Sequence, residues 1–187
     1  QYVSEQFVID FVQQYRSDFE AIQPSFFELA VAMSFEYFAW QKVDIAIIET
    51  GLGGELDSTN IVYPILSIIT NISFDHQQFL VILCPKSLKL KLVSSSLRHN
   101  ASLVYASDHY DARLKNSDLH HSTYDIFQDN QLTYSNLQLN SIGNYQQYNL
   151  QTCLQAVDIL NDIFIEIEED KLRLGLANVK EMTRFLG

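Results

Sequence analysis

Two amphipathic helices are predicted at the start of the chain. The first follows Ser4, a residue type favoured at helix N-caps, and repeats apolar side chains at helical spacing. These apolar positions are Phe7, Val8, Phe11, Val12 and Tyr15. The second helix is predicted to begin at Pro24 and Ser25 and to end around Trp40, because apolar or small residues again recur about every 3.6 positions. Each helix has one apolar face and needs a surface to pack against.

Two runs rich in β-branched residues, at 43–49 and 65–71, predict strands that are buried on both faces. Each run ends in polar residues: Glu49 closes the first, and the segment up to His76 follows the second. In open α/β sheets, ligands bind beyond the carboxyl ends of the strands. Both runs therefore indicate one ligand-binding crevice.

The later part of the chain has a more antiparallel character. Residues 102–107 predict a third strand, and residues 124–134 predict a hairpin that turns at Asp129 and Asn130. Helices are predicted from about Asn149 to Leu160 and over 168–177. The expected fold class is α/β, a Rossmann-like and mostly parallel sheet flanked by helices, with an antiparallel hairpin portion.

Composition narrows the classes of protein. The chain has 187 residues, 47% of them hydrophobic, which fits one globular domain. A net charge of −11 opposes non-specific binding to nucleic acid. Neither a membrane span nor a signal peptide is predicted, so a cytoplasmic location is expected. Cys84 and Cys153 lack the spacing of a metal site or a disulfide framework.

The strongest local signal is Gly-Leu-Gly-Gly at 51–54, directly after Glu49. Three glycines in four positions allow positive φ angles or a close approach of the backbone to a ligand. Short glycine patterns also occur in ordinary tight turns, and this motif alone leaves both interpretations open.

A wider set of motifs carries a family resemblance. The blocks Pro-Ser-Phe-Phe-Glu at 24–28, the strand and glycine run at 43–54, Leu-Asp-Ser-Thr-Asn at 56–60, Ile-Thr-Asn-Ile-Ser-Phe-Asp-His at 69–76 and Phe-Leu at 79–80 follow one another in this order. In that order they resemble the folylpolyglutamate and dihydrofolate synthases of the Mur ligase superfamily. Weaker similarity extends through 143–149. The resemblance implies that 1–187 are part of a Mur-ligase-type central, ATP-binding domain, without the N-terminal phosphate-loop segment and the C-terminal glutamate-ligase domain.

The family's chemistry, implied by this resemblance, is ATP-dependent amide formation. A carboxylate of dihydropteroate or a folate is phosphorylated to an acyl phosphate, and the amine of L-glutamate then displaces phosphate. The implied partners are small molecules, namely dihydropteroate or tetrahydrofolate, L-glutamate and ATP, with Mg²⁺ as the metal, and we expect a monomer. Mg²⁺ neutralises charge on the transferring phosphoryl group.

The resemblance also assigns metal ligands, since Glu49 and His76 match the family's metal-binding carboxylate and histidine. Mg²⁺ ordinarily prefers oxygen ligands, so the imidazole is the less expected of the two. Judged by its own surroundings, His76 could equally be a capping or hydrogen-bonded loop histidine.

Seven residues match family positions that line the pterin-bearing substrate: Ser25, Phe26, Phe27, Glu28, Leu56, Asp57 and Ser58. Aromatic faces and carboxylates can stack on and hydrogen-bond a flat heterocycle rich in donors. The alternative for Phe26 and Phe27 is filling of the core, which is the commoner role of large aromatics. Asn149 matches an ATP-contacting asparagine, and the alternative for it is a plain N-cap.

Three features depart from the family pattern. The phosphate-cradling loop GxxGKG[ST] is absent from these residues, and Glu55 stands where arginine is usual. Residues 81–96 differ from the family sequence, either as a divergent loop or through a frameshift, so the family's carbamylated lysine cannot be assigned to Lys91. We expect the fragment to be inactive alone. The alternative functions are a UDP-muramyl-peptide amino-acid ligase and a non-catalytic folate-binding or interaction module.

Overall fold

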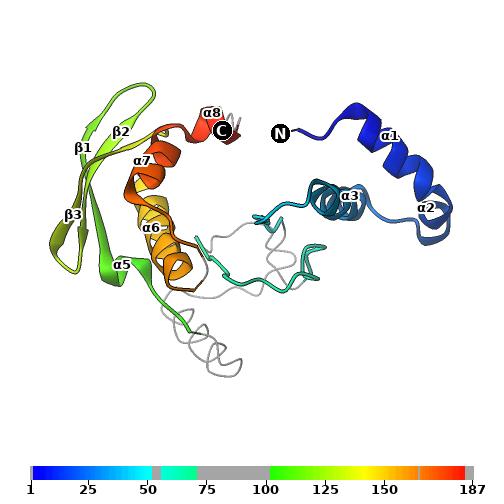
Figure 1. Cartoon of the computed structure of the whole chain (residues 1–187), viewed down its shortest axis with the longest axis horizontal. Helices are drawn as coiled ribbons and strands as arrows, with labels where there is room; N and C mark the ends of the chain where they lie inside the picture. The colour runs from blue at the N-terminus through cyan, green and yellow to red at the C-terminus, as the bar shows by residue number, and fades with distance from the viewer. Residues whose placement is uncertain (1, 52–55, 71–101, 164, 184–187) are drawn as a thin grey trace. The chain divides into compact units, whose positions relative to one another are not determined.

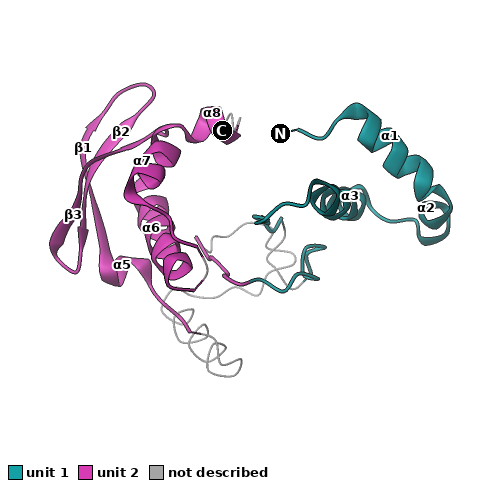
Figure 2. Ribbon diagram, in the orientation of Figure 1, with its two compact units in different colours: residues 1–64, 78–80 teal, residues 65–77, 81–187 magenta. Residues whose placement is uncertain are grey.

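The chain forms two compact units of different architecture. The computed structural model describes residues 2–51, 56–70, 102–163 and 165–183 (Figure 1). One unit comprises residues 1–64 with 78–80, and the other comprises residues 65–77 with 81–187 (Figure 2). Among the described residues, the first unit is helical and the second combines helices with a sheet. Within those residues, no helix combines the length and apolar character that crossing a membrane requires.

The described part of the first unit contains three helices: α1 (Glu5–Gln14), α2 (Arg16–Ile22) and α3 (Phe26–Gln41). The sequence predicted α1 and α3 correctly, whereas α2 was not predicted. Ser4 caps α1, since its side chain accepts a hydrogen bond from the Phe7 backbone N–H. The helices meet through aromatic side chains: the Phe7 and Tyr37 rings pack edge to face with centroids 5.0 Å apart. Phe11 and Tyr37 are the buried hydrophobic residues of these three helices.

The two runs predicted as buried strands are not strands in the described residues. Residues 43–49 and 65–70 contain neither helix nor strand, and Ile47 is 91% exposed. A strand exists only where a neighbouring strand takes up its backbone hydrogen bonds. No described residue does so here, so the apolar pattern alone does not produce the expected ladder.

The second unit contains an antiparallel sheet in the order β1-β2-β3, made of β1 (Tyr110–Ser117), β2 (Ser122–Gln128) and β3 (Gln131–Leu139). The predicted hairpin is β2 with β3. Its two-residue turn places Asp129 at φ 49° and Asn130 at φ 68°. Positive φ at both central residues defines a type I′ turn, whose twist matches that of the strands. The prediction of this turn from two residues that tolerate positive φ is therefore confirmed.

Helices α6 (Gln146–Ile163) and α7 (Glu169–Ala177) pack against this sheet (Figure 1). The buried core combines side chains from all three strands and both helices: Tyr110, Ala112, Tyr124, Ile126, Leu137, Leu139, Leu150, Leu154, Leu172 and Leu176. The short helix α5 (Ala106–His109) precedes β1, and α8 (Val179–Thr183) follows α7. The strand predicted at 102–107 is wrong, because the Asp108 N–H bonds the Tyr105 carbonyl and turns the chain into α5.

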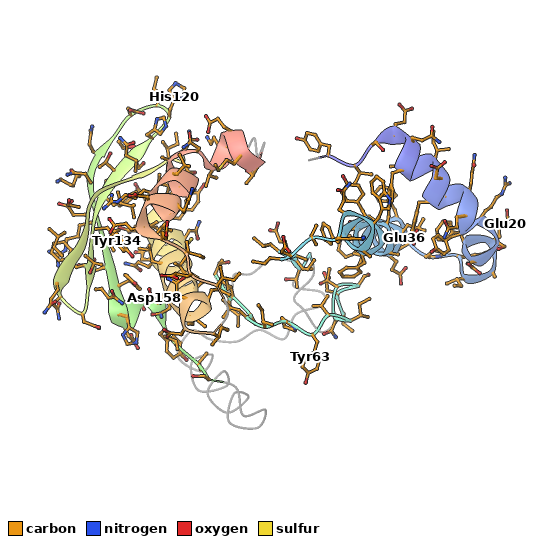
Figure 3. All side chains as sticks on the ribbon, viewed as in Figure 1. Glu20, Glu36, Tyr63, His120, Tyr134 and Asp158 are labelled. Atoms are coloured by element: carbon orange, nitrogen blue, oxygen red, sulfur yellow. The ribbon has the colours of Figure 1, made fainter. Side chains whose placement is uncertain are left out.

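A partly buried polar contact joins the sheet to α6. The Tyr110 hydroxyl donates to Asp158 Oδ2 at 2.6 Å, and Gln128 Nε2 donates to the same oxygen at 3.1 Å. Figure 3 labels Asp158 on α6. Burial, reinforced by the Asp158 carboxylate, raises the pKa of Tyr110 above its usual range. Tyr110 is therefore a neutral donor at physiological pH.

The face of β1 and β2 away from the core carries a cation–π contact and an ion pair. The Arg113 guanidinium lies 4.0 Å from the centroid of the Phe127 ring, and Lys115 Nζ lies 3.1 Å from Asp125 Oδ2. The Asn136 backbone N–H also donates to Asp125. These bonds lower the pKa of Asp125, the backbone donor more than Lys115.

Candidate functional site

The first predicted substrate residues begin helix α3. Ser25 is the N-cap, and its hydroxyl accepts a hydrogen bond from the Glu28 backbone N–H at 3.3 Å. Glu28 Oε2 in turn accepts from the Ser25 backbone N–H and hydroxyl, both at 2.7 Å. This reciprocal pair is a capping box. Hydrogen bonds from Ser25 lower the pKa of Glu28, so the carboxylate is stabilised in its charged form.

A buried carboxylate organises the turn after the glycine run. Asp57 is 5% exposed, and its Oδ2 accepts a hydrogen bond from the Gly51 backbone N–H at 2.7 Å. Its Oδ1 accepts from the Thr59 backbone N–H at 2.8 Å and from the Thr59 hydroxyl. The Asn60 N–H closes the turn on the Asp57 carbonyl. Asp57 therefore holds the turn in shape through its side chain.

The start of α3 reaches this turn at Gly51. A Cβ atom on Gly51 would lie 3.1 Å from Phe27 Cζ and 3.4 Å from Asp57 Oδ2. Two predicted substrate residues, distant in sequence, thus contact the same glycine, whose missing side chain makes room for the Phe27 ring.

Exposure separates the two phenylalanines from the core. Phe26 is 87% exposed and Phe27 is 43% exposed, so the core-filling alternative is wrong for Phe26 and holds at most in part for Phe27. Leu56 is 70% exposed, and Ser58 is partly buried. Exposed apolar side chains beside a fixed carboxylate are compatible with a flat, partly apolar ligand. Substrate binding by these residues stays a prediction.

The predicted metal pair lies only partly in the described chain. The Glu49 side chain is exposed, and a carboxylate oxygen is the type of ligand that Mg²⁺ prefers. His76 and Lys91 lie outside the described residues, as does Glu55. Among the residues the structure describes, no cluster of three or more His, Cys, Asp or Glu could hold a metal ion. The pairing of Glu49 with His76 stays a prediction.

The second unit contains a cavity of about 730 Å³. One face of α6 lines it, through Tyr145 just before the helix and then Tyr148, Asn149, Gln151, Thr152, Gln155, Ala156 and Ile159. Residues 66–70 and 104–107 line the rest. The spacing of three and four residues is that of one helical face. Asn149, the predicted ATP contact, is thus on the wall of a cavity large enough for a small-molecule ligand.

Asn149 is not an N-cap. Helix α6 begins at Gln146, and the Asn149 side chain donates to Gln146 Oε1 at 3.2 Å within the first turn. The N-cap alternative is therefore wrong, whereas contact with ATP stays a prediction.

The sequence did not predict three other features of this cavity. The side chain of Gln155 presents a buried Oε1 without a hydrogen-bond partner in the described part of the chain. Tyr145 and Tyr148 are 62% and 60% exposed. Helical spacing from Asn149 could have indicated Tyr145, Thr152 and Gln155, because each lies on the same face of α6.

Comparison of sequences identifies relatives over part of the chain. No family model matches. The chain is 54% identical over 59 residues to the dihydrofolate synthase/folylpolyglutamate synthase of Bacillus subtilis (strain 168), covering 31% of this chain and 14% of the relative. It is 41% identical over 69 residues to the folylpolyglutamate synthase of Lacticaseibacillus casei, covering 37% of this chain and 15% of the relative. The family resemblance inferred from the motifs is confirmed.

Solved structures extend the likeness to nearly the whole chain. The folylpolyglutamate synthase of Thermotoga maritima is 26% identical, with a TM-score of 0.78, over 95% of this chain and 46% of that one. The apo form of the L. casei enzyme is 20% identical, with a TM-score of 0.82, over 95% and 50%. A complex of such a synthase with AMPPCP gives a TM-score of 0.83 at 20% identity, over 95% and 51%. The chain thus spans about half the length of these neighbours, and the expected α/β, Mur-ligase fold class is confirmed. The described sheet is antiparallel, whereas a mostly parallel sheet was expected.

Proposed function

We propose that this chain, a homologue of the folylpolyglutamate and dihydrofolate synthases, forms part of an ATP-dependent ligase. The reaction adds L-glutamate to dihydropteroate or to a folate through an acyl phosphate. The observation that carries the proposal is the 54% identity over 59 residues to an enzyme named for both activities.

The pterin-bearing substrate is proposed to bind at the start of α3 and at the 56–60 turn. Support comes from the contact of Phe27 and Asp57 with the same glycine and from the exposure of Phe26 and Leu56 beside them. In this arrangement Ser25, Glu28 and Asp57 fix the backbone, because their side chains are engaged in the cap and the turn. Phe26, Phe27, Leu56 and Ser58 are then the side chains that would contact the heterocycle.

ATP is proposed to bind in the cavity along α6, with Asn149 as a contact. The cavity volume of about 730 Å³ suits a nucleotide, and a structural neighbour was solved with AMPPCP. Mg²⁺ would be held by Glu49 and His76. When bound, the ion neutralises charge on the phosphoryl group in transfer.

We propose further that residues 1–187 correspond to part of the central domain of such a ligase. These residues contain no GxxGKG[ST] loop, the element that cradles phosphates through backbone N–H groups. We therefore expect no turnover from the 187-residue chain alone. The cytoplasmic location and the monomeric state stay predictions.

A chimera tests the function. In the L. casei synthase, whose structure superposes on 95% of this chain, the matching segment is replaced by this chain, so that the phosphate loop and the C-terminal part come from the relative. With ATP, Mg²⁺ and L-glutamate, we expect phosphate release and a γ-glutamyl product with dihydropteroate or tetrahydrofolate as acceptor. Activity with a UDP-muramyl-peptide acceptor instead would favour the other ligase branch. A folded chimera that binds folate without releasing phosphate would favour a non-catalytic module.

A further inference from the structure

The cavity of the second unit has an aromatic edge where α6 begins. Tyr145 and Tyr148 both line it and both are more than half exposed, at 62% and 60%. Tyr145 lies just before α6 and Tyr148 in its first turn, and both line the cavity together with Asn149. An exposed aromatic face beside a cavity is a surface on which a flat heterocycle can stack.

The Tyr145 ring lies close against the backbone of Gly143. Gly143 has φ +122°, a conformation that L side chains rarely adopt. A Cβ atom there would lie 2.8 Å from Tyr145 Cε1 and 3.3 Å from both Cδ1 and Cζ. The ring therefore rests against the bare glycine, and any larger residue at 143 would displace it.

We propose that the Tyr145 ring is a stacking platform for the base of the nucleotide bound in this cavity. The inference rests on the proposed ATP site and adds a binding residue to it. A ring positioned before the ligand arrives loses little conformational entropy on binding. Tyr145 is chosen over Tyr148 because Gly143 supports the Tyr145 ring, while no glycine contact supports Tyr148 among the described residues.

Stacking predicts a dependence on the base and little dependence on its hydrogen-bonding groups, since every base presents a π-face. Alanine replacement of a stacking aromatic weakens binding by roughly 5- to 150-fold. Phenylalanine in its place should preserve the interaction, because the ring remains.

The test measures binding of ATP and of inorganic tripolyphosphate to the 187-residue chain by protein NMR titration. Tyr145→Ala should weaken ATP binding roughly 5- to 150-fold and leave tripolyphosphate binding unchanged, whereas Tyr145→Phe should bind both as the native chain does. Gly143→Ala, which keeps the ring but displaces it, should also weaken ATP binding selectively. Tyr63→Ala is the matched control, since Tyr63 is fully exposed in the first unit (Figure 3).

The outcomes separate this inference from the proposed function. If Tyr145→Ala binds ATP as tightly as the native chain, or loses ATP and tripolyphosphate equally, the stacking role is wrong while the ATP site stands. If neither the native chain nor the chimera that supplies the phosphate loop binds ATP, the ATP site itself fails, and the platform fails with it. Unfolding curves check the variants, and a native-like curve is expected for Tyr145→Ala because the side chain is largely exposed.

Discussion

The Asp57 carboxylate accepts a hydrogen bond from the Gly51 backbone N–H at 2.7 Å. This one contact joins the glycine that follows residues 43–50 to the turn at 56–60. Because the same carboxylate also holds Thr59, the position of the glycine and the shape of the turn depend on a single side chain. The aspartate of the Leu-Asp-Ser-Thr-Asn motif thus has a structural task in addition to any contact with substrate.

Asp57→Ala should loosen this turn. The substitution removes the acceptor of the Gly51 N–H, whose bond is partly buried, and of the buried Thr59 N–H, and a buried donor left unpaired costs about 1–3 kcal/mol. Hydrogen exchange should show faster exchange of both amides. Asp44→Ala, at an exposed carboxylate, serves as the control. Unchanged protection at Gly51 in Asp57→Ala would show that the carboxylate does not hold the turn.

Ser25→Ala should raise the pKa of Glu28 towards its ordinary value of 4.5, because the hydroxyl that stabilises the carboxylate is removed. The folded-state pKa of Glu28 is depressed, so its contribution to stability is present above pH 4.5 and is lost as the pH falls through the folded-state pKa. An NMR titration of the Glu28 side chain measures the shift. Ser4→Ala removes an N-cap elsewhere and should leave that titration unchanged. An identical Glu28 titration in Ser25→Ala would contradict the capping box.

Two glycine substitutions should act in opposite directions. Gly143→Ala should lower the melting temperature of the second unit, since its φ is +122° and the new Cβ would contact the Tyr145 ring. Gly175→Ala should raise stability by about 0.5–1 kcal/mol, because Gly175 lies inside α7 with open space around its Cα. Thermal unfolding of both variants beside the native chain provides the comparison, and a stabilising Gly143→Ala would show that the positive φ is not required.

Tyr110→Phe should reduce the decrease in unfolding free energy that occurs as the pH rises above 10. Burial raises the pKa of the Tyr110 phenol above 10.0 in the folded chain, so its contribution is complete below pH 10 and declines as the pH rises above it. The variant also loses the bond to Asp158, at a cost of about 1 kcal/mol near neutral pH. Denaturant unfolding between pH 7 and 11 tests both effects. Some alkaline dependence should persist, because burial raises the pKa of Tyr134 as well. Tyr63→Phe is the control. If Tyr110→Phe loses as much unfolding free energy as the native chain when the pH rises to 11, Tyr110 is not the source of the alkaline dependence.

Gln155→Leu should be neutral or stabilising. The Gln155 Oε1 is buried without a hydrogen-bond partner in the described structure, and replacing such a group by an apolar one of similar shape removes a desolvation cost. Gln128→Leu should instead destabilise, because Gln128 donates to Asp158. Urea unfolding measures the free energy of unfolding of both variants. A clear decrease for Gln155→Leu would show that the Gln155 amide has a hydrogen-bond partner.

Local chemistry explains what the sequence could predict. The caps at Ser4 and Ser25 and the turn at Asp129 and Asn130 each depend on residues within three or four positions, so their signals are complete in the sequence. Strand β1 is different. Its residues are mostly polar, and it is a strand because β2 pairs with it from Tyr110 to Ser117, a contact that periodicity does not encode.

In the candidate site, too, the sequence predicted what depends on nearby residues and missed what depends on tertiary contacts. The motifs identified Phe27 and Asp57 as neighbours in function, and the structure adds the shared contact at Gly51. Tyr145 was not predicted, because its spacing from Asn149 can indicate a shared side of the helix but not that this side lines a cavity. The strands expected at 43–49 and 65–71 required hydrogen-bonding partners that composition cannot specify.

The charged outer face of β1 has a consequence for solubility. Of the three described strands, β1 lies at one side of the sheet and carries Arg113 and Lys115, each already engaged by a neighbour on β2. Another polypeptide could extend the sheet along this side only by crowding and dehydrating those cations. We expect this margin of the molecule to resist fibril-like stacking, as charged side chains at sheet borders commonly do.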